Sequence, residues 1–204
     1  MKERPILFSA PMVRALLAGT KTQTRRIVKG EALKWLAPDM FIPQYVADPA
    51  NGMSPYGYAG DRLWARETHA FSVVDPEGLG WKEDPSNWDV IYRADESQPA
   101  GGWRDVDGKV IKAPWRPSIF MPRWASRITL DITNVSIERL NDISDTDAEA
   151  EGWPGYSDES AMDSMAWYSE LWDDINGPGS WEANPWVWIV EFRRLPESSR
   201  SSTP

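Results

Sequence analysis

The chain has 204 residues, of which 41% are hydrophobic and 26% charged, and its formal net charge is −9. This composition can form a sizeable core and argues against global disorder. The lack of cysteine excludes disulfides and thiolate chemistry, and a single histidine excludes a multi-histidine metal site. An all-carboxylate site for Mg²⁺ stays open, but we expect no metal and no cofactor.

The charge is unevenly distributed along the sequence. Residues 1–30 carry seven Lys or Arg and one Glu, whereas residues 141–184 carry twelve Asp or Glu and no Lys or Arg. A protein that coats nucleic acid neutralises many phosphates, so the net negative charge argues against binding of a long duplex. A basic segment with an acidic one suits a small anionic or polar ligand, although two solvated surfaces of opposite sign explain the pattern equally well.

No apolar run reaches the length of about 18 residues that a membrane-spanning helix needs. The N-terminus, MKERP, leads into a short apolar stretch, which is unlike a secretory signal. We therefore expect a cytoplasmic protein with no membrane partner.

The first helix is expected at about residues 10–18. Ser9 can cap it, Pro11 suits its first turn, and Gly19 suits the left-handed residue that ends a helix. The β-branched residues that follow, over 20–28, favour a strand.

Residues 29–59 contain four prolines and are predicted to be irregular. Alternating apolar and polar residues predict strands at 62–68 and 126–139, and an aromatic strand at 186–192. Ser144 begins a capping-box-like sequence, with Asp147 in place of the usual Glu or Gln, and predicts a short helix that ends at Gly152. A longer helix is expected from 159 to 175.

Residues 72–114 are rich in Gly, Pro and Asp and are predicted to be an irregular insertion with one hairpin near residues 90–92. Residues 197–204 are predicted to be a disordered tail, and residues 1–196 a single domain. Short strands, long connections and few helices indicate an α+β fold.

Three segments are informative together: the first helix with GTKTQTRR at 19–26, the strand GDRLWARE at 60–67, and the short helix that follows Ile143, before the closing aromatic strand. In this order they resemble the ASCH family. The resemblance covers about residues 5–70 and 115–195, and the longer arrangement is similar to uncharacterised phage and prophage members. It implies a PUA-like β-barrel of five to seven strands, with a few short helices and the helix at 10–18 over one opening.

Some members of the family are small amidohydrolases that deacetylate N4-acetylcytidine with a lysine base, a threonine nucleophile and a glutamate acid. The resemblance places these catalytic roles on Lys21, Thr24 and Glu151. A threonine hydroxyl needs an adjacent base, and Lys21 can serve only if burial or the nearby cations Arg25 and Arg26 lower its pKa. In a regular strand Lys21 and Thr24 point to opposite faces, so they converge only if the chain is irregular here.

The implied partner is a nucleoside or short single-stranded nucleic acid, held between residues 21–26 and 115–127 with an aromatic side chain stacked on the base. The candidate substrate-binding residues are Arg25, Arg26, Glu67, Trp115, Arg116, Arg123 and Trp124. Other interpretations stay open. The cations at 21–26 also fit a solvated or phosphate-contacting strand face. Glu151 also fits a surface position, and Glu67 also fits a pairing with an arginine. His69 is expected to be an ordinary loop histidine.

Two functions of different classes follow. One is a metal-independent hydrolase of an acylated nucleobase or nucleoside, similar to the N4-acetylcytidine amidohydrolases, and the presence of Lys21, Thr24 and Glu151 together favours it. The alternative is a non-catalytic RNA or modified-base binding module of phage origin. The insertion at 72–114, which the compact amidohydrolases lack, favours this module or a different substrate.

Overall fold

The computed structural model describes residues 1–37, 40–72, 89–95, 103–104, 110–111, 115–155 and 162–196. Most of the predicted insertion at 72–114 and the tail at 197–204 lie outside these residues. The chain divides into two compact units. Unit 1 consists of Met1–Arg4, Ala15–Leu63 and Thr129–Pro204, and unit 2 of Pro5–Arg14 and Trp64–Ile128.

The described elements follow one another along the chain as β1 (Glu3–Leu7), α1 (Ala10–Ala18), β2 (Gln23–Ile27), α2 (Gly30–Leu36), α3 (Pro43–Ala47), η1 (Pro49–Asn51), β3 (Arg62–Arg66), β4 (His69–Ser72), β5 (Asp89–Tyr92), β6 (Trp103–Arg104), β7 (Val110–Ile111), η3 (Ser118–Phe120), η4 (Arg123–Ala125), β8 (Thr129–Arg139), η5 (Leu140–Asp142), α4 (Asp145–Ala150), α5 (Ser164–Asn176) and β9 (Trp186–Arg194). The η elements are single turns of 3₁₀ helix. Among the described residues, no helix is long and apolar enough to cross a membrane.

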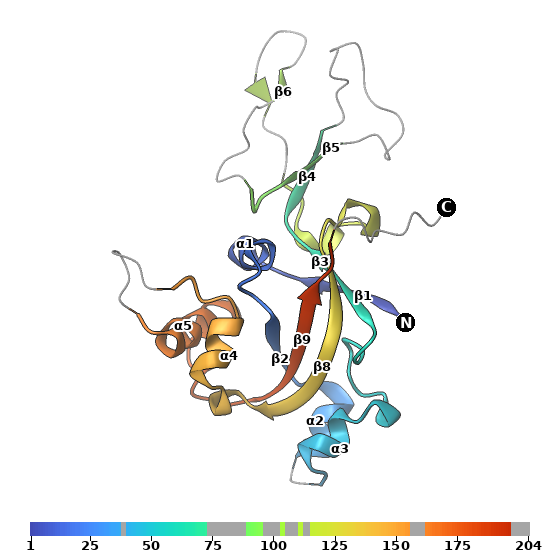
Figure 1. Ribbon diagram of the computed structural model, residues 1–204. Coiled ribbons are helices and arrows are strands. Elements are labelled where there is room, and N and C mark those ends of the chain that lie inside the picture. Colours follow the sequence, from blue (N-terminus) through green and yellow to red (C-terminus); the bar gives the residue numbers. More distant parts are fainter. Residues whose placement is uncertain are drawn as a thin grey trace. The chain divides into compact units, whose positions relative to one another are not determined.

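Five strands form one sheet in the order β1-β3-β8-β9-β2 (Figure 1). β9 runs antiparallel to both β8 and β2, and the β8–β9 register shifts at a bulge between Ile132 and Asn134. Two further pairs, β4-β5 and β6-β7, are separate. The result is a mixed α/β arrangement with few helices. In the described part of the chain β1 and β2 are edge strands, and no strand pairing closes the sheet into a barrel.

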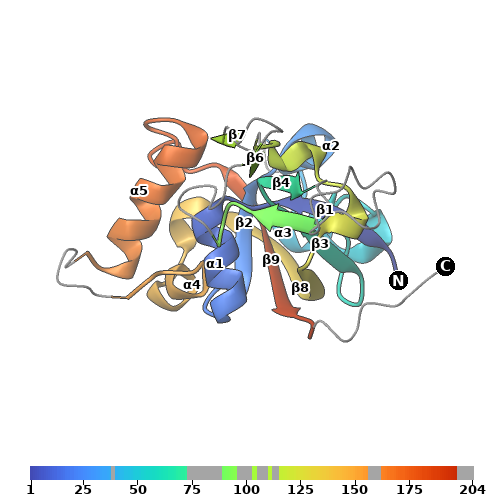
Figure 2. The same ribbon diagram turned by 90° about the horizontal axis from the view of Figure 1, so that it is seen from above.

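The core of unit 1 lies on both faces of β9. Val187 packs with α4 and α5, in a cluster that includes Tyr168 and Trp172. Its neighbour Trp188 points the other way and packs with α2 and α3. Because successive strand residues face opposite sides, a strand segment covered on both faces is apolar at every position, as residues 187–190 of β9 are. Figure 2 shows α5 on the same side of β2 and β9 as α4.

Most predicted elements are present, with shifts of a few residues at their ends. The helix at 10–18 and the strands within 20–28, 62–68, 126–139 and 186–192 are confirmed. The longer helix begins at residue 164 rather than 159.

The prediction that residues 29–59 are irregular was wrong, because α2, α3 and η1 lie there. Pro43 and Pro49 stand at the first position of α3 and η1. A proline fits this position because its missing N–H would have no partner within the helix. The prolines therefore begin helices here instead of interrupting them.

Unit 2 is built around the antiparallel β4-β5 pair. β5 confirms a strand near residues 90–92, but its partner is β4 at residues 69–72 and not a second strand within the predicted insertion. A small core of Phe71, Met121 and Ala125 packs behind this pair. The backbone of His69 also exchanges two hydrogen bonds with that of Arg116, at 2.7 and 3.2 Å, which fixes the segment beginning at residue 115 beside β4.

Candidate functional site

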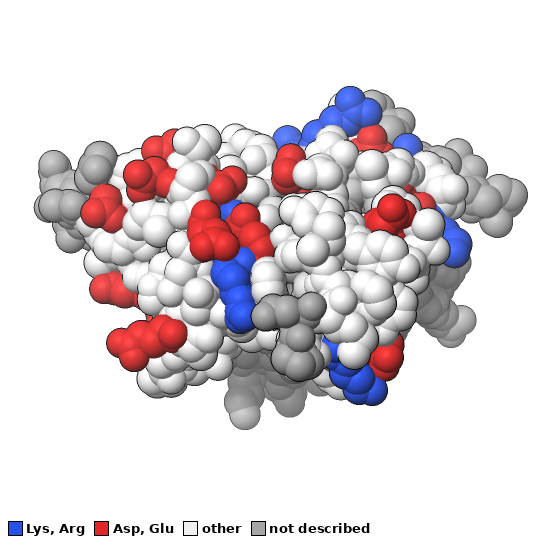
Figure 3. Space-filling model, turned by 90° about the horizontal axis from the view of Figure 1, so that it is seen from below, with Lys and Arg blue, Asp and Glu red and all other residues white. Residues whose placement is uncertain are grey.

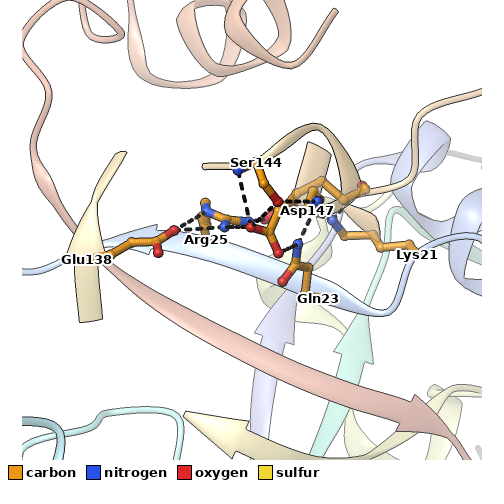
Figure 4. Close-up of polar contacts among 7 residues, drawn as sticks. Lys21, Gln23, Arg25, Glu138, Ser144 and Asp147 are labelled. Carbon is orange, nitrogen blue, oxygen red and sulfur yellow. Dashed lines mark hydrogen bonds and ion pairs between the residues drawn. The ribbon is translucent and has the colours of Figure 1, made fainter. Parts of the chain in front are cut away.

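Unit 1 contains a buried polar cluster between β2 and α4 (Figure 4). Lys21 forms a single β-bridge with Glu151. Its Nζ donates to Glu151 Oε2 at 2.6 Å and to the Glu151 backbone carbonyl at 2.7 Å. The two side chains are only 2% and 4% exposed. The pair is therefore a buried ion pair that joins residues 130 positions apart in the sequence.

Arg25 connects this pair to two more carboxylates. Its Nε and Nη2 donate to Glu138 Oε1 at 3.1 and 2.8 Å, Nη2 lies 3.3 Å from Asp147 Oδ2, and Nη1 lies 3.4 Å from Glu151 Oε1. Gln23 Nε2 donates to the carbonyl oxygen and to Oδ1 of Asp147, at 2.6 and 3.1 Å. Gln23 and Arg25 alternate along β2 and therefore share one face, and Lys21, just before the strand, reaches Glu151 on the same side.

The start and end of α4 position these acceptors. The predicted capping box is confirmed: the Ser144 hydroxyl accepts from the Asp147 N–H, and the Asp147 carboxylate accepts from the Ser144 N–H. After the helix, Gly152 adopts φ +103°, and a Cβ there would lie 2.9 Å from Ala15 Cβ and 3.3 Å from Lys21 Cβ. Only glycine lets the chain pass Lys21 this closely.

Burial sets the electrostatics of the cluster. It lowers the pKa of Lys21, although the Glu151 carboxylate opposes this effect. Burial also raises the pKa of Tyr168 well above its ordinary value, and Glu151 adds to that shift. For Asp147, burial opposes ionisation, but hydrogen bonds from Ser144 and Gln23 hold its pKa below the usual value. A lysine of lowered pKa beside a carboxylate has the chemistry of a general base.

Thr24 does not join the cluster. β2 is a regular strand, so Thr24 lies on the opposite face from Lys21 and Arg25, paired in register with Val190. Its side chain is buried, and in the described structure no hydrogen bond links it to Lys21 or Glu151. Arg26, half-buried, shares the face of Thr24. The structure thus brings together Lys21, Arg25 and Glu151 and leaves Thr24 and Arg26 on the other side of β2.

The outer side of α4 and α5 is acidic. α4 carries Asp145 and Asp147 in its first turn and has no basic residue in its last. In Figure 3, acidic side chains gather on the side where Figure 1 places α4 and α5. A phosphate group would be repelled from this side of unit 1.

Unit 2 presents a different set of side chains, the arginine–aromatic surface, defined as Trp64, Arg66, Phe71, Arg116, Arg123 and Trp124. The guanidinium groups of Arg66 and Arg123 lie over the Trp64 ring at 5.1 and 5.8 Å, and that of Arg116 lies over Phe71 at 5.0 Å. Phe71 stacks on Trp124 with ring centroids 5.2 Å apart.

The outer members of this surface are accessible. Trp124 is 48% exposed, and Phe120, on the preceding 3₁₀ turn, is 64% exposed. Trp115 lies beside the surface with Arg93 over its ring at 5.3 Å. Its Nε1 is buried and has no hydrogen-bond acceptor in the described structure. Of the predicted substrate-binding residues, Arg116, Arg123 and Trp124 are therefore brought together in unit 2.

The Glu67 carboxylate forms an ion pair with an arginine, which is the alternative that the sequence left open. Arg127 donates to both of its carboxylate oxygens, at 2.9 and 3.1 Å, and the same guanidinium binds Asp95 at 2.6 and 2.8 Å. Burial raises the pKa of Glu67, although Arg127 opposes the shift. Glu67 therefore holds Arg127 in place and offers no carboxylate oxygen to a ligand.

His69 is the residue that sequence reasoning missed. It was expected in a loop, but it begins β4 and is fully buried. Its ring meets Phe71 edge-on at 4.8 Å, and its Nδ1 lies 3.1 Å from the Glu67 carbonyl oxygen. Burial lowers its pKa. The signal that could have revealed it is the alternation of His69 with Phe71 on one strand face.

The expected ligand position between residues 21–26 and 115–127 involves both units, and it stays a prediction. No protein family model matches the sequence, and no curated protein matches it.

Among solved structures, the chain is similar to the ASCH domain from Lactobacillus crispatus JV V101, at 15% identity and a TM-score of 0.39, with 95% of this chain and 79% of that chain covered. It is also similar to protein EF3133 from Enterococcus faecalis V583, of the DUF984 family model, at 10% identity and a TM-score of 0.40, with 96% and 81% covered. Neither is described as a phage protein. The first is an ASCH domain, the family that three segments of the sequence also resemble.

Proposed function

We propose that this chain is an ASCH-type module with a PUA-like fold that binds a nucleoside or short single-stranded nucleic acid through the arginine–aromatic surface of unit 2. The observation that carries the proposal is the interleaving of Arg116 and Arg123 with aromatic rings beside the exposed indole of Trp124.

Each component of this surface has a role in binding. An exposed aromatic ring stacks on a base and contributes about 1–3 kcal/mol per base, whatever the base is. An arginine held over a ring keeps its planar donors oriented for phosphate or carbonyl oxygens. The buried carboxylate of Glu67 is neutralised by Arg127, so it does not repel an anionic ligand at Arg116 or Arg123.

The polar cluster of unit 1 supports catalysis less well. Lys21 and Glu151 are paired with each other and almost completely buried, so neither faces a substrate in this arrangement. Thr24, the expected nucleophile, is on the other face of β2 and cannot transfer its proton to Lys21 from there. Binding without chemistry therefore fits the geometry better than hydrolysis.

A second candidate function is metal-independent hydrolysis of an acylated nucleobase such as N4-acetylcytidine. One observation favours it: burial lowers the pKa of Lys21, and Glu151 lies within hydrogen-bond distance of its Nζ. In this alternative Lys21 is the base and Glu151 the acid. Thr24 acts as nucleophile only if the start of β2 rearranges.

Titration of the protein with nucleosides and with a short labelled oligoribonucleotide, followed by fluorescence anisotropy, tests the proposal. Loss of one stacked base through Trp124→Ala is expected to weaken binding by roughly 5- to 150-fold. Arg193→Ala is the matched control, because this exposed arginine of unit 1 pairs only with Asp131 among the contacts described. Equal weakening by both variants contradicts the assignment to unit 2.

Incubation with N4-acetylcytidine separates the two candidate functions. The binding module releases no acetate above the uncatalysed rate. Release that is abolished by Lys21→Met and persists in Trp124→Ala supports the hydrolase instead.

A further inference from the structure

The tautomer of His69 is fixed by its surroundings. A carbonyl oxygen can only accept, so the Nδ1 that lies 3.1 Å from the Glu67 carbonyl must carry the proton and donate. In the neutral ring the other nitrogen, Nε2, then carries the lone pair. Burial and the nearby guanidinium of Arg116 both favour this neutral form.

Nε2 of His69 is a buried acceptor that no donor within the described structure reaches. His69 as a whole is 0% exposed. Leaving a buried acceptor unpaired costs about 1–3 kcal/mol, so such groups in folded proteins call for an explanation. Another buried polar atom in the unit, Trp115 Nε1, belongs to the next segment, on a residue adjacent to the one that bridges to His69.

The position of His69 suggests what the acceptor is for. Its ring packs edge-on against Phe71, and Phe71 in turn stacks on the half-exposed indole of Trp124. Arg116 lies over the same Phe71 ring. A flat base that inserts between Phe71 and the Trp124 indole gains an aromatic contact with each ring, and it brings its polar edge to the layer in which His69 lies.

We infer that Nε2 of His69 accepts a hydrogen bond from an N–H group on the edge of the bound base, an inference that rests on the proposed function. Stacking on Phe71 and contact with Arg116 do not distinguish one base from another. An acceptor of fixed tautomer does, because it binds only a base that offers an N–H donor. The ligand class is therefore a nucleobase with an amino or imino N–H at this edge. A base that lacks the donor leaves Nε2 unpaired and binds more weakly.

Three pairs of nucleosides test this inference on the wild-type protein. Cytidine is compared with pyrimidin-2-one ribonucleoside and adenosine with purine ribonucleoside, because these analogues lack the amino donor and add no bulk. Uridine is compared with 3-methyluridine, which lacks the imino donor. At least one parent is expected to bind about tenfold more tightly than its analogue, the usual contribution of one hydrogen bond.

Two variants attribute the difference to His69. His69→Phe removes the acceptor and is expected to reduce the tenfold difference to less than about twofold. His69→Gln places an amide oxygen near the position of Nε2 and is expected to keep part of it. Urea denaturation of each variant identifies any variant that is unfolded. The comparison of parent nucleosides with their analogues on the wild-type protein does not depend on these variants.

The outcomes distinguish the inference from the function beneath it. Binding of the parent nucleosides with no preference over any analogue overturns the role of His69 and leaves the proposed function intact. Discrimination that persists in a folded His69→Phe protein does the same. If the wild-type protein binds the oligoribonucleotide but no nucleoside, the role of His69 is overturned and the proposed function stands. If it binds neither, the proposed function fails, and this inference fails with it.

Discussion

The buried Lys21–Glu151 pair predicts a large and pH-dependent loss of stability when one partner is removed. Glu151→Gln removes the carboxylate that lies 2.6 Å from Lys21 Nζ and 3.4 Å from Arg25 Nη1. The Lys21 side chain is only 2% exposed, so water cannot solvate its ammonium group once the carboxylate is gone. Breaking a buried pair in this way typically destabilises a protein by about 3–5 kcal/mol. Because glutamine still offers an oxygen to Lys21 Nζ, we expect about 3 kcal/mol near neutral pH.

The sign of the pH dependence follows from Lys21. Burial already lowers its pKa from the ordinary value of 10.5, and Glu151 opposes that effect, so removal of Glu151 lowers the pKa further. Between the folded and unfolded pKa values the unfolded chain binds more protons, and stability therefore rises with pH across this window. The deficit of Glu151→Gln is thus largest near neutral pH and shrinks as the pH approaches 10.5.

Urea denaturation followed by tryptophan fluorescence, at neutral and at alkaline pH, measures both effects. Glu149→Gln is the matched control, because Glu149 is an exposed residue of α4, the helix that Glu151 caps, and a change within about 0.5 kcal/mol is expected there. A deficit for Glu151→Gln no larger than that of the control, or one that grows with pH, would refute the reasoning.

Three further changes test other parts of the structure, each by urea denaturation. Ser144→Ala removes the cap of α4 and is expected to destabilise the protein by about 1 kcal/mol. Gly152→Ala is expected to be more harmful than Gly155→Ala, because both glycines have positive φ but only at Gly152 would the new Cβ meet neighbouring atoms. Arg127→Leu leaves Glu67 buried without its partner, with an expected loss of about 3 kcal/mol. Because the pKa of Glu67 is raised in the folded state, that loss is greatest at neutral pH and declines as the pH falls through the folded pKa.

The sequence predicted those features that depend on local rules. The helix at 10–18 has its cap, proline and glycine within the segment itself, and the capping box of α4 spans only Ser144 to Asp147. The two-residue period of a strand also implied that Lys21 and Thr24 converge only if the chain is irregular at this point, and the structure has a regular strand from Gln23 onward.

Features that depend on distant contacts could not be predicted in this way. The burial of Lys21 follows from its pairing with Glu151, which is 130 positions away. His69 was expected in a loop because nothing near it in the sequence shows that the segment at Arg116 will pair with its backbone. A proline can either interrupt a helix or begin one, and the sequence of residues 29–59 does not show which of the two occurs. The outcome depends on how the segment packs in the fold.

Photo-cross-linking of a short single-stranded oligoribonucleotide, mapped by mass spectrometry, tests the binding proposal most directly. The account predicts adducts on the peptide that spans residues 115–127, centred on Trp124, which decrease when unlabelled single strand is added and not when duplex is added. Adducts confined to peptides of unit 1, such as those that contain β2 or α5, would contradict it.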